Sequence, residues 1–457
     1  MKSEKEWLRR QPEESAVERT LDGARLLGHV FFMQQKSLIS IYYLISYSLL
    51  WFGYSSFVIP VHGYSGFEWY PNTVKIIEGV IFVLIISFML PTKFSKPSDI
   101  FLHLQAFFPI LPMLVLYGAA DLPGKYVYYA LVAFGLIVVV SRNVRLKALI
   151  AFDLPPALLQ KALLIISAIY ILSIVGFGGL RYLNFDFSRV YELRADAASG
   201  LPKTYGYFSP MVSKVLLPFA LIFAVANKSR FFALAAMTGS MLMFGLTNHK
   251  GPIFYPLAAL ALYFILQRKK SIQWFLVANM ATILVSSTAG GLMGSLLLRR
   301  SYFLPAHLNF LYYDFFSVNP HLMWADSKIT FGILDSLYDL DSTHLIGFEY
   351  YSNVETGANT GWIGSGYMQL GFAGMMIYAF IIGLLFSLLD AYSQKVDKRV
   401  IVSMALAPMS GLLLSSDLPT AFLTHGILLA LLLLSSFSMK QGSDILRTRL
   451  SFGRAAA

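Results

Sequence analysis

Apolar residues form long runs that recur along the whole chain and are separated by short polar or charged stretches. A run of about 20 apolar residues is long enough to cross the hydrocarbon core of a bilayer as a helix. The pattern predicts about twelve transmembrane helices, at residues 38–60, 74–91, 101–120, 125–141, 162–180, 209–226, 231–247, 251–267, 272–297, 362–389, 400–416 and 420–438. The fold class that this pattern indicates is an all-α polytopic membrane protein.

The composition indicates the same class, and the charges orient the chain. Hydrophobic residues make up 56% of the sequence and charged residues 13%, with a mean hydropathy of +0.62, whereas soluble domains are about one quarter charged. Most of the 36 lysines and arginines fall in segments that face the cytoplasm if the N-terminus does. The net charge of +11 therefore indicates orientation and contact with anionic lipid, and nothing further indicates a nucleic-acid partner.

Three parts follow from this orientation. We expect a cytoplasmic N-terminal tail at 1–37, a transmembrane domain at 38–438 and a cytoplasmic C-terminal tail at 439–457. The chain has no cysteine, which excludes disulfides, thiolate catalysis and cysteine-ligated zinc. Length outside the spans is concentrated in two outer loops, 181–208 and 298–361, and loops of this length are usually functional or disordered. The second is too rich in tyrosine for disorder, so we expect short helices that lie on the bilayer.

The first outer loop carries two arginines, Arg189 and Arg194, on the side of the membrane where basic residues are normally scarce. Guanidinium groups donate paired hydrogen bonds to phosphate, so one hypothesis is that these arginines hold a diphosphate while Glu192 or Asp196 orients them or acts as a base. The alternative is a surface helix in which the four charged side chains pair with one another at helical spacings.

A second group of candidates begins at Arg299 and Arg300, at the outer end of a span. His307 and Asp314 follow at a spacing of seven, which puts them on roughly one face of a helix. A histidine or a carboxylate there could take the proton from an attacking sugar hydroxyl. The alternatives are that the arginines anchor the span at the headgroups and that His307 is a structural histidine.

The third candidate is the short outer turn at 247–252, where His249, Lys250 and a glycine could bind an anion or could simply be solvated.

Asp417 and His425, near outer helix ends, have no assigned role. Three acidic residues could hold a divalent cation but match no strong motif: Asp335, Asp339 and Asp341. We therefore expect no metal site.

These segments resemble the O-antigen polymerases (Wzy family) of Gram-negative bacteria, which are related in architecture to O-antigen ligases and other GT-C-type glycosyltransferases. The resemblance covers roughly residues 180–390. It is carried by Arg189 with Gly200 after ten intervening residues, by Asn-His-Lys-Gly-Pro at 248–252, by Arg-Arg-x-Tyr-Phe-x-Pro-Ala at 299–306 with Tyr-Tyr-Asp-Phe-Phe at 312–316, and by Gly-Trp-Ile-Gly-Ser-Gly-Tyr-Met-Gln-Leu-Gly at 361–371.

The resemblance implies a GT-C-like fold in the bacterial inner membrane, with both termini cytoplasmic and the active site facing the periplasm. The substrate would be an undecaprenyl-diphosphate-linked oligosaccharide, whose growing chain is transferred to a new lipid-linked repeat. No cofactor is implied, and a chain-length regulator of the Wzz type is a candidate partner. The residues that would bind the diphosphate are Arg189, Arg194, Lys250, Arg299, Arg300 and Tyr313, and the candidate bases are His307, Glu192, Asp314 and His249.

Three other functions remain as alternatives. An O-antigen ligase has the same chemistry and architecture but transfers the glycan to lipid A–core, so only the acceptor distinguishes it. A flippase for lipid-linked oligosaccharides would have cations within the spans, around a central cavity, whereas here they cluster in outer loops. A non-catalytic chain-length regulator would need few spans and a long coiled coil, and neither is present in the sequence.

Overall fold

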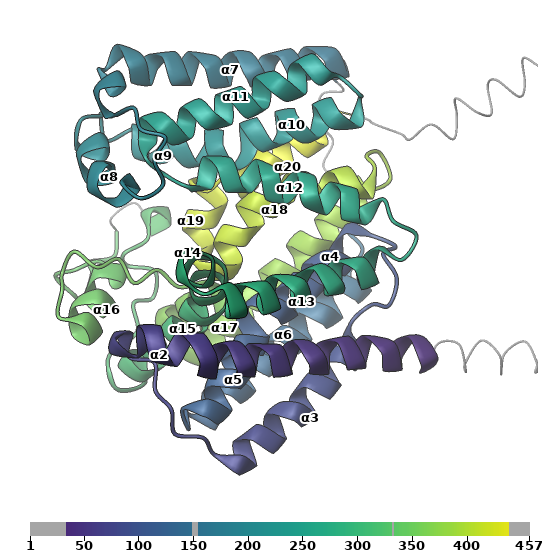
Figure 1. Ribbon diagram of the computed structural model, residues 1–457, viewed down its shortest axis with the longest axis vertical. Coiled ribbons are helices and arrows are strands. Elements are labelled where there is room, and N and C mark those ends of the chain that lie inside the picture. The colour runs from purple at the N-terminus through teal and green to yellow at the C-terminus, as the bar shows by residue number, and fades with distance from the viewer. Residues whose placement is uncertain (1–32, 149–153, 331–332, 438–457) are drawn as a thin grey trace, which may run out of the picture.

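The computed structural model describes residues 33–148, 154–330 and 333–437, and these residues form helices without a β-strand (Figure 1). In chain order the helices are a first helix (Met33–Ser65), which includes α2 (Ile59–His62), then α3 (Thr73–Met89), α4 (Pro97–Gln105), α5 (Leu111–Ala119), α6 (Gly124–Asn143), α7 (Pro156–Gly176), α8 (Val190–Ser199), α9 (Tyr205–Met211), α10 (Leu217–Ala226), α11 (Arg230–Thr247), α12 (Gly251–Leu266), α13 (Ser271–Ala289), α14 (Gly291–Met293), α15 (Leu304–Val318), α16 (Ser342–Tyr351), α17 (Trp362–Tyr392), α18 (Lys398–Leu414), α19 (Leu418–Leu423) and α20 (Ile427–Ser435). Four π-helical stretches lie within or between them: η1 (Tyr54–Val58), η3 (Ala106–Ile110), η5 (Val212–Leu216) and η6 (Gly294–Phe303). Three short 3-10 turns complete the order: η2 (Gly63–Ser65), η4 (Gly179–Tyr182) and η7 (Lys328–Thr330).

Eight helical segments of the described chain are long and apolar enough to cross a membrane, which agrees with a polytopic membrane protein. They are Met33–Ser65, Pro97–Ala119, Gly124–Asn143, Pro156–Gly176, Tyr205–Ala226, Arg230–Thr247, Ser271–Ala289 and Trp362–Tyr392. Helices also occupy the four other predicted ranges, but α3 and α18 have 17 residues each and α12 has 16, and the range 420–438 holds two short helices, α19 with 6 residues and α20 with 9. Seventeen residues rise about 26 Å, slightly less than the hydrocarbon core. Twelve spans therefore remain a prediction.

The ends of the chain differ partly from the expected division. The first helix begins at Met33, so residues 33–37 belong to it rather than to the predicted tail. The Lys36 ammonium donates hydrogen bonds of 2.6 Å to the carbonyl oxygens of Phe88 and Leu90, which fixes this end of the helix against the end of α3. The rest of the predicted tails, 1–32 and 439–457, lies outside the described residues.

Glycines with positive φ break three of the predicted spans, and one of them is Gly426 (φ of +90°), between α19 and α20 in the range 420–438. The predicted helix 272–297 ends at Ala289 because Gly290 and Gly291 have φ of +58° and +51°, values that side chains other than glycine rarely adopt. The chain then continues as α14 and η6 into α15. Within α17, Gly371 has φ of +59° and separates an outer arm (362–369) from the longer remainder of the helix.

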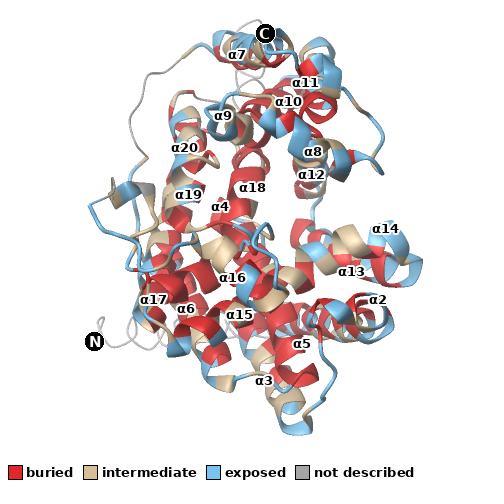
Figure 2. Cartoon of the chain, turned by 90° about the vertical axis from the view of Figure 1, so that its left-hand side faces the viewer, coloured by how far each residue is buried: buried red, intermediate tan, exposed pale blue. Residues whose placement is uncertain are grey.

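The core lies around α4, α5 and α18 (Figure 2). Helix α18 contacts α10 and α12 on one side and α4 and α17 on another. In Figure 1, α7, α10, α11 and α12 form a layer on one side of α18 to α20, while α3, α5, α6 and the first helix lie on the opposite side. The segment from Pro97 to Ala119 is 94% buried over its most apolar window, so it crosses the centre of the bundle rather than its lipid-facing rim.

Both predicted outer loops contain short helices, and α8 and α16 lie at the same end of the bundle (Figure 1). Each of these two helices has 10 residues. The expectation of surface helices is wrong for α15, which belongs to the second loop. Nine of its 15 residues are buried, including Pro305, Asn309 and Tyr312, because the helix packs against α17 and η6. Residues 304–318 of the predicted loop are therefore part of the core.

Candidate functional site

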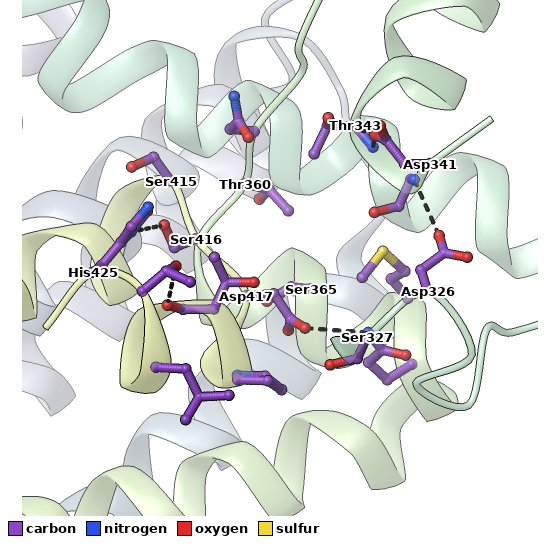
Figure 3. A pocket seen from close by; sticks show the side chains of 18 of the residues that line it. Asp326, Ser327, Asp341, Thr343, Thr360, Ser365, Ser415, Ser416, Asp417 and His425 are labelled. Atoms are coloured by element: carbon purple, nitrogen blue, oxygen red, sulfur yellow. Dashed lines mark hydrogen bonds between the residues drawn. The ribbon is translucent and has the colours of Figure 1, made fainter. Parts of the chain in front are cut away.

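A polar cavity of about 340 Å³ lies where the two outer segments meet the C-terminal helices. Its walls come from α9, α15, the start of α16, the outer arm of α17 and the connection from α18 to α20. The carboxylates of Asp326, Asp341 and Asp417 and the imidazole of His425 line it, together with many hydroxyl and amide groups. Figure 3 shows Ser416 and His425 at one end and Asp326 and Asp341 at the other. Such a lining suits a ligand rich in hydroxyl groups.

Asp417 is held in this cavity by side chains from both parts of α17. The Tyr378 hydroxyl donates to its Oδ1 at 2.7 Å, and the Gln369 amide donates to its Oδ2 at 3.4 Å. Burial raises the pKa of the Asp417 carboxyl from 3.8 to about 6, although these hydrogen bonds act in the opposite direction. A carboxylate with a pKa close to neutrality is suited to accept a proton from a hydroxyl group.

The other two carboxylates of the cavity, those of Asp341 and Asp326, accept hydrogen bonds from backbone N–H groups. Asp341 caps α16, because its Oδ1 accepts hydrogen bonds from the backbone N–H groups of Thr343 and His344. Its second oxygen, Oδ2, lies 2.7 Å from Nδ1 of His344. Asp326 accepts a hydrogen bond of 3.2 Å from the backbone N–H of Ser342. The two oxygens of Asp417 accept hydrogen bonds from side chains of α17, those of Tyr378 and Gln369.

At the opposite end, the Ser416 hydroxyl and Nδ1 of His425 share a hydrogen bond of 2.5 Å. This bond fixes the orientation of the imidazole ring relative to the turn between α18 and α19. Both residues line the cavity, so a ligand there would meet a positioned imidazole beside Asp417.

The outer arm of α17 is held in place by a buried asparagine. Oδ1 of Asn309 accepts hydrogen bonds from the backbone N–H of Gly364 at 2.9 Å and from the Thr360 hydroxyl at 2.8 Å. A Cβ on Gly364 would lie 2.8 Å from that same oxygen, so the close approach requires glycine at this position. Ser365 and Gln369, on this arm, face the cavity.

The break in α17 also orders the loop before α16. The carbonyl oxygens of Met368 and Gln369 accept hydrogen bonds from the backbone N–H groups of Leu322 and Met323, at 3.1 and 3.0 Å. The side-chain oxygen of Gln369 accepts a further hydrogen bond of 2.6 Å from the backbone N–H of Trp324. The kink therefore links the outer arm to the loop that supplies Asp326.

An apolar groove of about 440 Å³ lies between α12, α13 and α18. Alanines 258 and 261 of α12, which line it, are exposed on the surface of the bundle, so the groove is open to the surroundings of the helices. On α18, Ser410, Leu413 and Leu414 line the groove, and the three residues that follow, 415–417, line the polar cavity. The two spaces therefore adjoin at the end of α18.

The first outer loop and the turn at 248–252 come together, as the orientation argument expects of segments on one side. Asn248 adopts a left-handed conformation with φ of +54°, and its side-chain amide donates to the carbonyl oxygen of Tyr182 at 2.9 Å. The Asn184 amide donates to Oδ1 of Asn248 at 3.0 Å. Arg194 lies close to His249, and burial together with the Arg194 charge lowers the pKa of His249 to about 4. His249 lines a smaller cavity of about 180 Å³.

The remaining candidates of the first loop are on the surface. Arg189 pairs with Glu192 at 3.6 Å, and the two side chains are 59% and 71% exposed. This is the local pairing that the alternative interpretation of the loop expects. The Lys250 ammonium lies 6.0 Å from the centroid of the Phe187 ring.

The second group of candidates forms a separate site at η6 and α15. His307 is 8% exposed, its ring lies 4.8 Å from that of Phe67, and burial together with the charge of Arg299 lowers its pKa to about 4. Nε of Arg299 is buried without a hydrogen-bond partner among the described residues. Arg300 is exposed at the same end of η6.

Further along α15, Tyr313 stacks on Tyr126 with ring centroids 4.6 Å apart, so it packs among aromatic rings. Asp314 is exposed and accepts a hydrogen bond of 2.6 Å from the Tyr350 hydroxyl. A spacing of seven puts His307 and Asp314 on one face of the helix but about 10 Å apart along its axis. The two groups are therefore too far apart to act on one atom.

None of the ten candidate residues lines the polar cavity. The sequence did contain a signal for it, because the segment 361–371 supplies Ser365 and Gln369 to its wall. Asp417 and His425 were visible in the sequence without an assigned role.

Among the described residues, no group of three or more histidine, aspartate or glutamate side chains is placed to hold a metal ion. Comparison with known proteins finds no matching family, curated protein or solved structure.

Proposed function

We propose that the chain is a glycosyltransferase that polymerises undecaprenyl-diphosphate-linked oligosaccharide repeats at the outer face of the bacterial inner membrane. One observation carries the proposal: Ser410, Leu413 and Leu414 line an apolar groove, and the next three residues, 415–417, line a polar cavity. A substrate with an isoprenoid chain, a diphosphate and a glycan needs both kinds of surface next to each other. The eight apolar helices support a substrate that arrives from the bilayer.

The reaction joins a hydroxyl group of the acceptor sugar to the anomeric carbon of the donor glycan. The new C–O bond forms as the bond to the diphosphate breaks, and the lipid diphosphate leaves with the electron pair. The proton of the attacking hydroxyl passes to a base. Cations near the leaving group lower the barrier because negative charge accumulates there in the transition state.

Asp417 is the base that the cavity favours. Its carboxylate lines the polar space, and its pKa of about 6 leaves it ionised at neutral pH while it is more basic than an ordinary carboxylate. The four bases expected from the sequence remain candidates, but His307 packs against Phe67 and Asp314 holds Tyr350. Neither side chain lines the polar cavity that Asp417 lines.

The arginines of the outer segments are the candidate cations for the diphosphate. Arg194 lies beside His249 at the first loop, and Arg299 lies beside His307 at η6. Ser301, which follows Arg300 in the chain, lines the apolar groove. A lipid-linked diphosphate in that groove would therefore have a basic residue near one of its walls.

The test uses the full chain in proteoliposomes with an undecaprenyl-diphosphate-linked repeat, and measures the length of the released glycan on a gel. We expect a ladder from the wild type, single repeats from Asp417→Asn, and a ladder from Glu355→Gln, a matched change at an exposed outer carboxylate.

Two other results would refute polymerisation and identify the alternatives. Transfer of the glycan to lipid A–core without elongation would indicate a ligase. Movement of the lipid-linked repeat across the bilayer without any new glycosidic bond would indicate a flippase.

A further inference from the structure

A buried lysine, Lys214, lies beside α18 close to side chains of the apolar groove and of the polar cavity, although it lines neither space itself. Lys214 is 8% exposed and belongs to η5, a π-helical turn within the helix Tyr205–Ala226. Single π-helical turns inside longer helices are rare and often occur at functional sites. The residue was not among the candidates from the sequence, since it lies within an apolar run.

Lys214 has no anionic partner in the described part of the chain. Its ammonium lies 5.7 Å from the centroid of the Tyr255 ring, and no hydrogen bond or ion pair to another described residue satisfies it. A buried ammonium without a counter-charge is costly, and an ionisable residue within a membrane helix is usually functional. An anionic ligand at this place would therefore neutralise a buried positive charge.

The position of the ammonium is set by glycine on α18. A Cβ on Gly411 would lie 3.2 Å from Nζ of Lys214 and 3.1 Å from Nδ1 of His425. The two nitrogen atoms thus approach the same point on α18 from α9–α10 and from the α19–α20 turn. The absence of a side chain at Gly411 leaves this approach open.

Side chains close to the ammonium or to Gly411 line both spaces. Tyr255 lines the apolar groove, whereas Ser416 and His425 line the polar cavity. A ligand that fits this sequence of surfaces has an apolar chain, then an anionic group, then a hydroxyl-rich group. Phosphate is the anion that a compact ammonium commonly binds in proteins.

We propose that Lys214 binds a phosphate group of a lipid-linked diphosphate whose isoprenoid chain lies in the groove between α12, α13 and α18. This inference rests on the proposed function, because that function supplies the substrate class. The inference adds to the proposed function by assigning the diphosphate to a buried lysine rather than to the arginines of the outer segments alone. His425 and Ser416 then lie on the glycan side of the phosphate.

The first experiment measures binding of undecaprenyl diphosphate, which carries no sugar, to the full chain in nanodiscs. Loss of a hydrogen bond between charged groups weakens binding roughly 10- to 100-fold, and we expect this loss for Lys214→Met. Lys228→Met is the matched control, because Lys228 is exposed in the turn that follows the same helix. Undecaprenol and inorganic pyrophosphate, which each carry half of the ligand, should bind more weakly than the intact lipid to the wild type.

Two further variants test the site without removing the lysine. Gly411→Ala places a methyl group between the two nitrogen atoms and should weaken binding of the diphosphate lipid. Ala261→Phe fills the groove from an exposed position and should weaken binding of the lipid but not of inorganic pyrophosphate. Ala168→Phe, at an exposed position of α7, should leave both unchanged.

The outcomes separate the two proposals. If the Lys214→Met variant is folded, as judged by its melting temperature, and binds undecaprenyl diphosphate as tightly as the wild type, the assignment of Lys214 as the phosphate-binding residue is overturned. Equal binding of inorganic pyrophosphate and of the lipid would assign the site to a free anion and overturn the lipid assignment. A wild type that binds the lipid through Lys214 but never elongates the glycan supports the site and overturns the proposed function.

Discussion

Replacement of Asp417 by asparagine removes a charge and a proton acceptor with almost no change of shape. The amide oxygen of asparagine can still accept the hydrogen bond of 2.7 Å from the Tyr378 hydroxyl. The contact with the Gln369 amide is lost, but at 3.4 Å it is long, and its loss should cost less than about 1 kcal/mol. If Asp417 is the base, the rate of glycan elongation should fall by about 10² to 10⁴.

The same change should not weaken the fold. Burial raises the pKa of the Asp417 carboxyl from 3.8 to about 6, so the ionised group destabilises the folded protein. The destabilisation appears as the pH rises from about 4 to about 6 and is fully present above it. A difference of about two pKa units corresponds to roughly 3 kcal/mol, which asparagine avoids. At pH 7.5 we therefore expect Asp417→Asn to melt at the same temperature as the wild type or higher, while it is inactive.

The pH dependence of the wild type gives an independent reading. The base must be ionised to act, so the elongation rate should fall as the pH drops through about 6, by about tenfold for each further unit. Initial rates between pH 5 and pH 8 in proteoliposomes measure this, with melting temperatures recorded in the same buffers. A rate for Asp417→Asn within threefold of the wild type, or a wild-type rate that rises towards pH 5, would refute the assignment.

Three other changes test the scaffold and the outer loop. Asn309→Leu leaves the buried N–H of Gly364 without an acceptor and should destabilise the protein by about 1–3 kcal/mol, seen as a lower melting temperature. Gly371→Ala forces φ of +59° on alanine, at a cost of about 1–3 kcal/mol, and should lower both stability and elongation, because the outer arm of α17 moves. Arg189→Ala removes only an exposed pair with Glu192, worth less than about 1 kcal/mol; its melting temperature should be unchanged, so any loss of elongation would report contact with the substrate.

The apolar runs of the sequence predict where the helices lie because burial in lipid and burial in the core impose the same requirement on composition. They do not predict where a helix breaks. Glycines in membrane helices usually allow close packing, yet Gly290 and Gly371 have φ values of +58° and +59° and interrupt their helices. The same residue type serves both purposes, and the choice depends on neighbours such as His321, whose ring lies 3.1 Å from where a Cβ on Gly371 would be.

The candidate site could likewise be predicted from the sequence only in part. The segment 361–371 attracts attention in the sequence, and it does form part of the cavity wall, through Ser365 and Gln369. The basic pairs of the outer loops are conspicuous because charges are rare in this chain. Several of these conspicuous charges, however, lie on the surface, and Arg189 pairs there with Glu192, only three residues away.

Asp417 and Lys214 carry the chemistry of the proposals because they are charged and largely removed from water, and a linear sequence does not display that property. Locally, Lys214 looks like any lysine whose stem lies along apolar surface while its ammonium reaches the headgroups. Its position beside Gly411 and His425 requires two parts of the chain that are far apart in the sequence to converge. A buried charge is tolerated only when something compensates it. The protein supplies Tyr378 for Asp417 but supplies no such partner for Lys214 among the described residues, so the compensation for the lysine has to come from a ligand.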